Sequence, residues 1–432
     1  MAVGDQPAAA GAAVSGRGAG DLPDGLALAQ SPAAIMKPTS TMNPAGRKPV
    51  IVHLAIDVNT PQRPRTTTAI EWFVEALTGF DNVVIAYQRL ERPVPAPVEC
   101  TPRGYRLFHF PFFGLRFGIG LGRSMRVAAR RTIALLEREG IRPDLVHAHK
   151  LTFEGLAGWY VARHFGVPLF VSLRGEVETK IFRMKPGLRA RLRQISADAA
   201  RLYFVSAWFR PEFHRYVPPQ PAKERLLPNI VRNVAPTIAE HVPGDRFVTI
   251  FNLDTWRRKG VRGLLDGVAR AAAAEPGIRL DIIGGGSTAA MDRIRAMIAE
   301  RGLGDVVNLV GAVPNAELLA RLPRYRALLL PSLNETFGMV YVEALFAGLP
   351  ILFTRDTAID GYLEGMDVAR TAAARDADEI AAAILDLHRN TDTLRANVAA
   401  SAGRLFEIFN PARTVESYQN DVRAAIAAHT ID

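Results

Sequence analysis

Short apolar, β-rich runs alternate with helix-length amphipathic segments along most of this 432-residue chain. One series begins at residues 50–56 (VIVHLAI) and continues through residues 143–149 (PDLVHAH). A second series begins at residues 246–254 (RFVTIFNLD) and runs to PILFT at residues 350–354. Alternation of strands and helices predicts parallel sheets with helices on both faces. We therefore expect an α/β fold of two doubly wound, Rossmann-like domains facing a cleft, with ligands at the carboxyl ends of the strands.

Changes in composition along the chain suggest where the domains begin and end. The start is rich in Ala, Gly and Pro and has no periodicity, which is typical of a disordered tail. A misassigned start codon, with Met36 or Met42 as the first residue, also explains it. We expect four segments: a tail at 1–48, a first α/β domain at 49–230, a second α/β domain at 231–409, and a closing helical segment at 410–432.

Composition limits the cellular setting and the partners. The chain has one cysteine, Cys100, so an internal disulfide is excluded and a reducing cytosol is expected. No apolar run approaches the ~18–20 residues of a membrane span. The net charge of +10 favours anionic partners, which include nucleotides, nucleic acid and acidic lipid.

Two glutamates stand out in residues 331–350, PSLNETFGMVYVEALFAGLP, where Glu335 and Glu343 have seven residues between them. An apolar strand precedes Glu335, and a helix is predicted to start near Gly338. Free N–H groups at a helix start attract anions, so residues 336–339 suit phosphates. Glu335 can then reach a polar group attached to the phosphates, and Glu343 can bind a diol such as ribose. An ordinary amphipathic helix with Glu335 as a capping residue is the alternative.

The same stretch closely resembles the E-x7-E signature of retaining glycosyltransferases of family 4, which have the GT-B fold. Three further segments are similar to family motifs: DIIGGGS at 281–287, RRKGVRGLLDGVAR at 257–270, and LLPNIV at 226–231. The resemblance covers roughly residues 49–420 and is stronger in the second half. It implies an enzyme that takes a sugar from a nucleotide-diphosphate donor without a metal ion or other cofactor. It also implies that the domain at 49–230 binds the acceptor, that the domain at 231–409 binds the nucleotide sugar, and that residues 410–432 form a helix that returns to the first domain.

The resemblance also implies roles for single residues. Glu343 would hold the ribose, Glu335 the hydroxyls of the donor sugar, and Lys259 would neutralise the diphosphate leaving group. A fixed cation there is physically reasonable, because charge builds on the leaving oxygens as the glycosyl–phosphate bond breaks. The remaining donor-binding candidates are Thr336, Phe337, Gly338, Met339, Gly284 and Gly285.

The sequence departs from the family pattern around the phosphates. The family's Arg before the Lys is absent from IFNLDTWRRKG, where Arg257 or Arg258 either replaces it or is surface charge. The family's Gly-Gly loop is replaced by NTPQRPRTTT. There Arg65, Thr66 and Thr67 either bind an anion at a helix start or form an ordinary capped loop.

Two further candidates follow strands of the first domain. Arg174 stands where the family often has a histidine, and it is a candidate for contact with the sugar or phosphate. His147 and His149 alternate along LVHAH, and His149, at the strand end, is the better candidate for the cleft. We expect one of this pair to be a core histidine.

Residues 103–131 mix aromatic side chains with arginines, which suits an anionic membrane surface or a lipid-linked phosphate. A buried strand and helix with an exposed basic face is the alternative. No nucleic-acid motif accompanies the charge, so we expect no nucleic-acid partner.

The sequence thus predicts a cytoplasmic, metal-independent retaining glycosyltransferase, peripheral on the inner membrane, that acts on a glycan or lipid-linked acceptor of the cell envelope or an exopolysaccharide. Other GT-B activities, such as a phosphorylase or an epimerase, are alternatives, and the glutamate pair argues against the epimerase. A non-catalytic nucleotide-sugar-binding subunit is another alternative. A dinucleotide oxidoreductase is the weakest, because GGGS occurs without the rest of that fingerprint.

Overall fold

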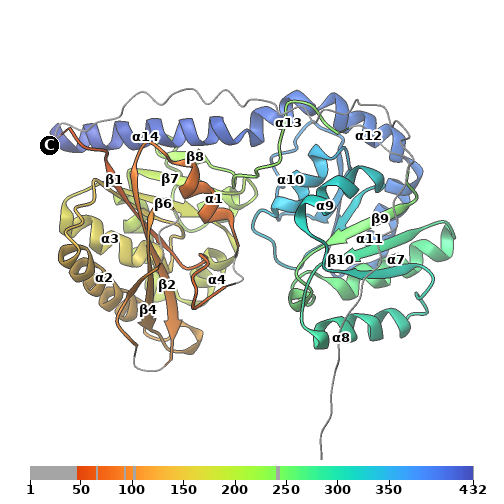
Figure 1. Cartoon of the computed structure of the whole chain (residues 1–432), viewed down its shortest axis with the longest axis horizontal. Helices are drawn as coiled ribbons and strands as arrows, with labels where there is room; N and C mark the ends of the chain where they lie inside the picture. The colour runs from red at the N-terminus through yellow and green to blue at the C-terminus, as the bar shows by residue number, and fades with distance from the viewer. Residues whose placement is uncertain (1–45, 65–66, 92–93, 101–103, 240–243, 432) are drawn as a thin grey trace, which may run out of the picture. The chain divides into compact units, whose positions relative to one another are not determined.

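The structure is a computed structural model (Figure 1). It describes residues 46–64, 67–91, 94–100, 104–239 and 244–431. Most of the predicted disordered tail, residues 1–45, lies outside the described residues, as do Arg65 and Thr66.

The first domain is built on an eight-stranded sheet with the order β3-β4-β2-β1-β5-β6-β7-β8. Neighbouring strands are parallel, except that β3 runs antiparallel to β4. Helices cover both faces of such a sheet, which is why β1 and β5 are buried almost end to end and read as apolar runs. The strands are β1 (Val50–Ala55), β2 (Asp81–Leu90), β3 (Val98–Cys100), β4 (Arg106–Phe113), β5 (Leu145–Ala148), β6 (Leu169–Leu173), β7 (Arg201–Phe204) and β8 (Glu224–Leu226).

The helices of the first domain bury one apolar face each against this sheet. In the longest, α2, the buried positions include Leu121, Met125, Ala129 and Leu136, at the three- and four-residue spacing of one helical face. The helices are α1 (Ala69–Ala76), α2 (Leu121–Arg138), α3 (Phe153–Phe165), α4 (Glu176–Met184), α5 (Arg189–Asp198) and α6 (Phe209–His214), with short 3-10 turns η1 (Arg116–Gly118) and η2 (Pro186–Leu188).

The second domain has a six-stranded, fully parallel sheet with the order β11-β10-β9-β12-β13-β14. Its central strand β12 is entirely buried, as the run ALLLPS predicts. The strands are β9 (Arg246–Ile250), β10 (Arg279–Ile283), β11 (Val307–Gly311), β12 (Leu328–Leu330), β13 (Ile351–Thr354) and β14 (Ala369–Ala372).

The helices of the second domain connect these strands and then run on beyond the sheet. The helical elements are η3 (Leu253–Thr255), α7 (Val261–Ala274), α8 (Thr288–Ala299), α9 (Asn315–Arg321), η4 (Leu322–Arg324), α10 (Met339–Phe346), α11 (Ala377–Arg389), α12 (Thr391–Ala400) and α13 (Ala402–Phe409). The Asp376 carboxylate caps α11 by accepting from the backbone N–H groups of Asp378 and Glu379, both at 3.0 Å.

The final helix, α14 (Pro411–Ile431), packs on the first domain and not on the second. Its Tyr418 and Val422 are 0% exposed and belong to the core beneath β1, β2 and α1. Asp421 accepts a hydrogen bond from the Tyr203 hydroxyl at 2.9 Å and pairs with Arg201 at 2.8 Å. The two doubly wound domains and the returning helix are therefore as the sequence predicts (Figure 1).

The parallel topology determines where a site can form. His149 directly follows β5, Asn252 follows β9, Gly284 follows β10 and Pro331 follows β12. These positions are the carboxyl ends of strands, where polar groups from loops gather in doubly wound sheets.

Candidate active site

The loop that carries Glu335 joins β12 to α10, and α10 begins at Met339 after the N-cap Gly338. Gly338 has a left-handed φ of 73°, and a Cβ there would lie 2.4 Å from the Tyr341 ring. A side chain is therefore excluded by packing as well as by backbone strain. Phe337 is 0% exposed and packs in the core, so its main chain alone can meet a ligand.

Lys259 and Glu335 form an ion pair, and both side chains are largely buried, at 13% and 12% exposure. The segment that carries Lys259 and the loop that carries Glu335 are held together by backbone contacts. The Leu333 N–H donates to the Arg258 carbonyl at 2.8 Å, and Gly260 packs so closely on the Pro331 carbonyl that a Cβ would lie 2.3 Å from it. The predicted cation and carboxylate thus meet in front of the start of α10.

Glu343 is the fifth residue of α10 and is half-buried. Burial raises the pKa of its carboxyl group. Within the described part of the chain, its carboxylate has no hydrogen-bond or ion-pair partner. This carboxylate is therefore free to accept hydrogen bonds from a ligand.

The glycine turn after β10 borders a cavity of about 540 Å³. Gly284 and Gly286 are required by packing, because a Cβ at either would lie under 3 Å from the segment that follows β9. The lining includes Phe251, Asn252, Asp254, Gly284, Gly285 and Val313.

The two candidate replacements for the missing arginine lie apart from this pair. The Arg257 guanidinium stacks over the Trp256 ring at 5.0 Å. Arg258 is exposed, and among the described residues only its main chain forms a hydrogen bond. Neither guanidinium joins the ion pair of Lys259 and Glu335. The structure therefore favours the surface-charge alternative for both arginines over replacement of the missing arginine.

Arg174 and His149, two predicted site residues from different strands, are in direct contact. The Arg174 Nε–H donates to the His149 carbonyl oxygen at 3.0 Å, and Nη1 donates to the Asn229 Oδ1 at 3.3 Å. Asn229 lies in the predicted LLPNIV link, so the guanidinium connects that link to the end of β5. Burial lowers the pKa of Arg174, and the carboxylates of Asp57, Glu154 and Glu178 oppose the shift.

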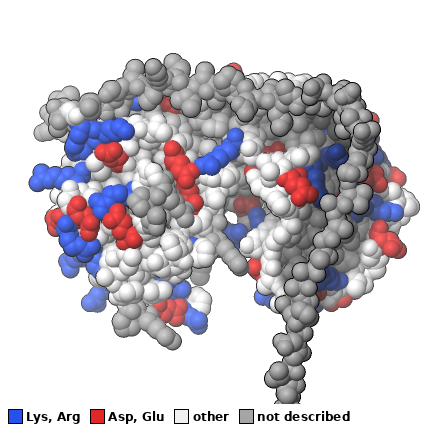
Figure 2. All heavy atoms as spheres, viewed as in Figure 1, with Lys and Arg blue, Asp and Glu red and all other residues white. Residues whose placement is uncertain are grey.

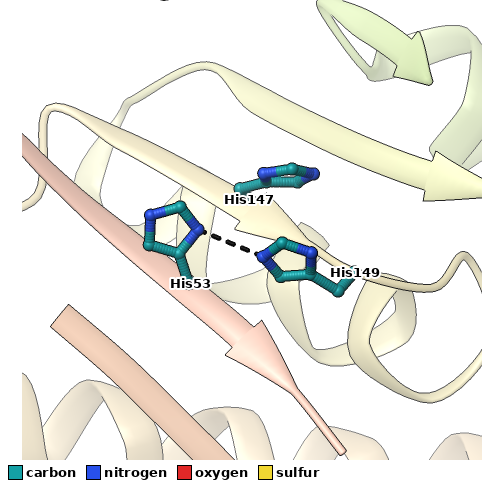
Figure 3. Close-up of side chains that lie close together, drawn as sticks. All are labelled: His53, His147 and His149. Carbon is teal, nitrogen blue, oxygen red and sulfur yellow. Dashed lines mark hydrogen bonds between the residues drawn. The ribbon is translucent and has the colours of Figure 1, made fainter. Parts of the chain in front are cut away.

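His53, His147 and His149 form a buried cluster that the sequence did not predict (Figure 3). His53 Nδ1 and His149 Nε2 are 3.1 Å apart. Burial lowers the pKa of His53 to about 4 and those of His147 and His149 well below the usual value, so all three are neutral at pH 7.

This histidine cluster has the composition of a metal site but not its geometry. Both ring nitrogens of His147 are already bonded at 2.9 Å, to the Ser172 and Tyr418 hydroxyls. The His147 and His149 rings stack with centroids 4.1 Å apart, so their nitrogens do not converge on one point as metal ligands do. The cluster is a hydrogen-bonded part of the core.

A group of buried charges lies beside the cluster. Lys150 pairs with Asp57 at 2.5 Å. Glu154 Oε1 accepts from the Ile56 N–H at 3.0 Å, whereas its buried Oε2 has no partner among the described residues. Burial raises the pKa of Glu154 to about 7, which makes it a carboxyl group that titrates near neutral pH.

Ser206 and Trp208, which the sequence did not single out, reach the Glu335 loop from the first domain. The Ser206 hydroxyl and the Trp208 Nε1–H both donate to the Thr336 carbonyl oxygen, at 2.5 and 3.1 Å. Beside them lies a cavity of about 900 Å³ lined by both domains. Its lining includes Thr179, Arg183, Trp208, Tyr216, Glu335 and Asp356.

Of the predicted phosphate loop, Thr67 lies within the described residues. Its hydroxyl accepts from the Ala69 N–H at 3.3 Å, so it caps the start of α1. This contact is the ordinary capped-loop alternative, and anion binding by the loop stays a prediction.

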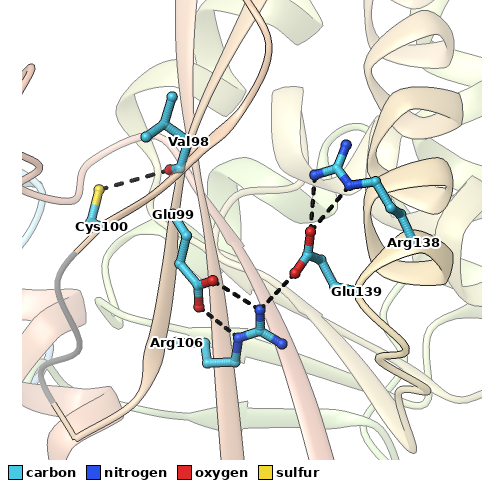
Figure 4. A network of polar contacts seen from close by, with 6 residues as sticks. All are labelled: Val98, Glu99, Cys100, Arg106, Arg138 and Glu139. Atoms are coloured by element: carbon cyan, nitrogen blue, oxygen red, sulfur yellow. Dashed lines mark hydrogen bonds and ion pairs between the residues drawn. The ribbon is translucent and has the colours of Figure 1, made fainter.

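Residues 103–131 divide into a buried and an exposed part. Strand β4 is mostly buried, and Arg106 pairs with Glu99 at 2.6 Å and with Glu139 at 2.9 Å (Figure 4). Arg131 is bonded to two backbone carbonyls. The exposed part is limited to the segment after β4 and to the outer face of α2.

Two family models match the chain. The model described as "Glycosyl transferase 4-like domain" matches residues 64–229, and the model described as "Glycosyl transferases group 1" matches residues 244–390. These ranges take in both sheets except for strand β1, and the second contains Lys259, Glu335 and Glu343.

Curated relatives and solved structures point the same way. The D-inositol 3-phosphate glycosyltransferase of Corynebacterium jeikeium is 25% identical over 70% of this chain and 79% of its own length. A GDP-mannose-dependent alpha-(1-6)-phosphatidylinositol monomannoside mannosyltransferase of Mycolicibacterium smegmatis is 28% identical over 52% of this chain and 62% of its own.

Sucrose-phosphate synthase from Thermosynechococcus elongatus aligns with a TM-score of 0.67 at 19% identity, over 88% of this chain and all of that one. HepE from Anabaena, solved with UDP and glucose, aligns with a TM-score of 0.62 at 12% identity, over 86% of this chain and 99% of that one.

The two α/β domains and the returning helix have the GT-B fold of these solved structures, and both family models are models of glycosyltransferases. The chain belongs to the group 1 glycosyltransferases, family 4. None of the helices in the described ranges has the length and apolar character needed to cross a membrane.

Proposed function

We propose that this enzyme is a retaining, metal-independent glycosyltransferase that transfers a sugar from a nucleotide-diphosphate sugar to a glycan or lipid-linked acceptor in cell-envelope or exopolysaccharide synthesis. The observation that carries the proposal is the pair of Lys259 and Glu335 in front of the N-terminus of α10.

The pair suits a diphosphate leaving group. When a donor binds, its phosphates replace Glu335 as the partner of Lys259, and the N–H groups at the start of α10 bind the same oxygens. Lys259 then stabilises the charge that develops on the leaving diphosphate, as a preorganised cation does without a metal ion. Glu335, released from Lys259, accepts hydrogen bonds from the sugar hydroxyls.

The rest of the second domain suits the nucleoside. The unpartnered carboxylate of Glu343 binds the ribose diol, and the cavity beside Gly284 and Gly285 receives the base. In the first domain, His149 and Arg174 lie at the end of β5 and contact the transferred sugar or its phosphate.

The acceptor enters from the first domain. The relatives are named for acceptors that carry inositol with a phosphate group, as D-inositol 3-phosphate or as a phosphatidylinositol mannoside. The cavity beside Trp208 and Glu335 is open to both domains and provides room for such a polyol.

An exposed apolar tip supports the lipid-linked form of the acceptor. We define the apolar tip as Leu115, Phe117, Ile119 and Met184, whose exposed fractions are 44%, 85%, 57% and 71%. The Gly118 Cβ position lies 3.9 Å from Lys185, so the loops at 115–119 and 184–185 adjoin.

Basic residues flank the apolar tip on both loops, namely Arg116, Arg123, Arg183 and Lys185. Apolar side chains within a basic rim fit an anionic bilayer surface, and we assign the tip to peripheral binding at the inner leaflet. Elsewhere, the face shown in Figure 2 carries Lys and Arg interspersed with Asp and Glu and not a single basic field. This pattern gives no support to a nucleic-acid partner.

The test is to titrate a panel of nucleotide sugars by calorimetry and to follow release of the nucleoside diphosphate with membrane lipid extract as the acceptor. We expect one donor to bind and to be consumed, with a product that keeps the anomeric configuration of the donor. Glu335→Gln should abolish release. Binding without release in the presence of extract would instead establish a non-catalytic donor-binding subunit, and an inverted product would refute the retaining mechanism.

A further inference from the structure

The distances within the histidine cluster determine which ring nitrogen of His149 carries the proton. A neutral histidine has one N–H donor and one bare acceptor nitrogen. The tautomer of a histidine is determined by what its neighbours can donate or accept. His149 is hydrogen-bonded to His53, and His53 is hydrogen-bonded to Asn82.

The orientation of the Asn82 amide is determined by two backbone carbonyls. Its Nδ2 lies 2.9 Å from the Leu77 oxygen and 3.4 Å from the Phe80 oxygen. Carbonyl oxygens only accept hydrogen bonds, so the group that faces them must be the NH₂. The Oδ1 atom, which can only accept, must then face His53 Nε2 at 3.1 Å.

This orientation fixes the protons on both histidines. His53 must donate through Nε2–H to Asn82, and because His53 is neutral its Nδ1 is a bare acceptor. The nitrogen 3.1 Å from it, His149 Nε2, must therefore carry a proton. His149 is neutral too, so its Nδ1 keeps a lone pair.

Of the three histidines, His149 lies closest to the carboxyl end of a strand. His149 follows β5 and is 2% exposed, whereas His53 and His147 are both 0% exposed. Its Nδ1 has no hydrogen-bond partner within the described ranges. Arg174 donates to the His149 carbonyl oxygen and holds the main chain, and the ring itself is held through Nε2 by His53.

We propose that Asn82 and His53 are positioning residues that hold His149 as the Nε2–H tautomer, so that its bare Nδ1 accepts a hydrogen bond from a substrate hydroxyl. The proposal rests on the proposed placement of His149 at the transfer site. In the opposite tautomer His149 would present an N–H group, which can donate to the oxygen of that hydroxyl but cannot accept its proton.

The first experiment measures the tautomer and needs no substrate. The full-length enzyme, labelled with ¹⁵N in its histidines, is examined by long-range ¹H–¹⁵N NMR at pH 7, and the His149 signals are assigned by their loss in His149→Asn. We expect a protonated Nε2 and an unprotonated Nδ1. A protonated Nδ1 on His149 would overturn the proposal whether or not the enzyme transfers sugar.

The second experiment removes the hydrogen bond between Asn82 and His53. Asn82→Leu removes the amide that accepts from His53 Nε2, so both histidines can reverse together, and the NMR signals should show both tautomers. If the two are equally populated, the competent fraction and the turnover fall about twofold. Nucleoside diphosphate affinity, which depends on the second domain, should be unchanged.

Two controls separate positioning from a general structural effect. His149→Asn keeps an acceptor oxygen near the Nδ1 position and should retain more turnover than His149→Leu, with equal thermal stability in the pair. If Asn82→Leu does not fold, the tautomer of the unmodified enzyme still decides the question. A single unchanged tautomer in folded Asn82→Leu would show that Asn82 does not set it.

Discussion

The indole N–H of Trp208, on the first domain, donates to the carbonyl oxygen of Thr336, on the second, at 3.1 Å. Thr336 is the residue after Glu335, so this bond and the parallel one from Ser206 hold the catalytic loop in register with the first domain. A carbonyl held by two donors orients the peptide plane that follows it, and that plane supplies an N–H group at the start of α10.

We expect Trp208→Phe to lower turnover by about three- to tenfold, since one neutral hydrogen bond contributes about 0.5–1.5 kcal/mol. The ring is kept, so the affinity for the nucleoside diphosphate should change little. Steady-state kinetics and calorimetry measure the two quantities. Trp159→Phe on α3 is the matched control, because the Trp159 Nε1–H donates to Asp198 at 2.7 Å within the first domain. Equal losses in both variants would argue against a role for the interdomain bond.

The ion pair of Lys259 and Glu335 predicts opposite effects on nucleotide binding. Lys259→Met removes the cation that meets the diphosphate, and we expect its affinity to fall about 10- to 100-fold, the range for a hydrogen bond to a charged group. Glu335→Gln removes a competing anion and frees Lys259, so affinity should be equal or greater while transfer falls at least about 100-fold. Calorimetry with nucleoside diphosphate measures both. Weaker binding in Glu335→Gln would contradict the proposed exchange of partners.

Glu154 predicts a dependence of stability on pH. Its pKa is raised from 4.5 to about 7 in the folded chain, so between these values the native state holds a proton that the unfolded state has lost. Stability contributed by this group therefore falls as pH rises from about 4.5 and levels off above about 7. Glu154→Gln removes the titration, so its stability relative to the unmodified enzyme should improve by up to about 3 kcal/mol across that window.

Chemical denaturation at several pH values from 4.5 to 9 tests this prediction. Glu300→Gln, at an exposed ion pair, is the control and should show a flat difference. If the free energy of unfolding of Glu154→Gln differs from that of the unmodified enzyme by the same amount at every pH, the Glu154 carboxyl group titrates at its ordinary pKa.

The apolar tip predicts membrane binding that depends on two side chains. Phe117→Ser with Ile119→Ser removes two exposed apolar groups, each of which contributes about 1.5–3 kcal/mol when buried in a bilayer. We expect the bound fraction on anionic vesicles to fall at least about tenfold, and thermal stability to be unchanged. Val127→Ser, 49% exposed on α2 and outside the tip, is the control. Binding is measured by vesicle sedimentation. Equal binding of all variants would show that the apolar tip does not contribute to membrane binding.

Metal independence is tested by chelation. With Lys259 as the cation at the leaving group, treatment with EDTA should leave the transfer rate within about twofold of the untreated rate. A loss of activity that Mg²⁺ or Mn²⁺ restores would show that a metal ion assists the departure of the diphosphate.

The order of strands and helices in both domains is readable from the sequence because parallel strands are buried on both faces and leave long apolar runs. The Glu335 loop is readable for a different reason, since Glu335, Gly338 and Glu343 lie close together in the chain and their geometry follows from one strand, one turn and one helix. The three-residue strand β3 and the edge strand β14 carry too short a pattern to be recognised.

The parts that the sequence did not predict depend on register between strands. His53 lies beside His147 because β1 and β5 pair in one register, and a shift of one residue would place His53 on the other face. Ser206 and Trp208 meet Thr336 across some 130 residues of chain, so no local pattern links them. Arg106, predicted as part of a basic surface, is paired with Glu99 on the neighbouring strand β3 and with Glu139, which lies 33 residues away in the sequence.

Helix α14 completes the core of the first domain but is synthesised after the second domain. Tyr418 and Val422 fill the core under β1 and β2, and Tyr418 bonds to the ring of His147. A ribosome synthesises the strands of the first domain early, yet the side chains that complete this core emerge among the last. The first domain must therefore wait, with an apolar face uncovered, while the whole second domain is translated. An apolar face that stays uncovered during this interval is open to aggregation.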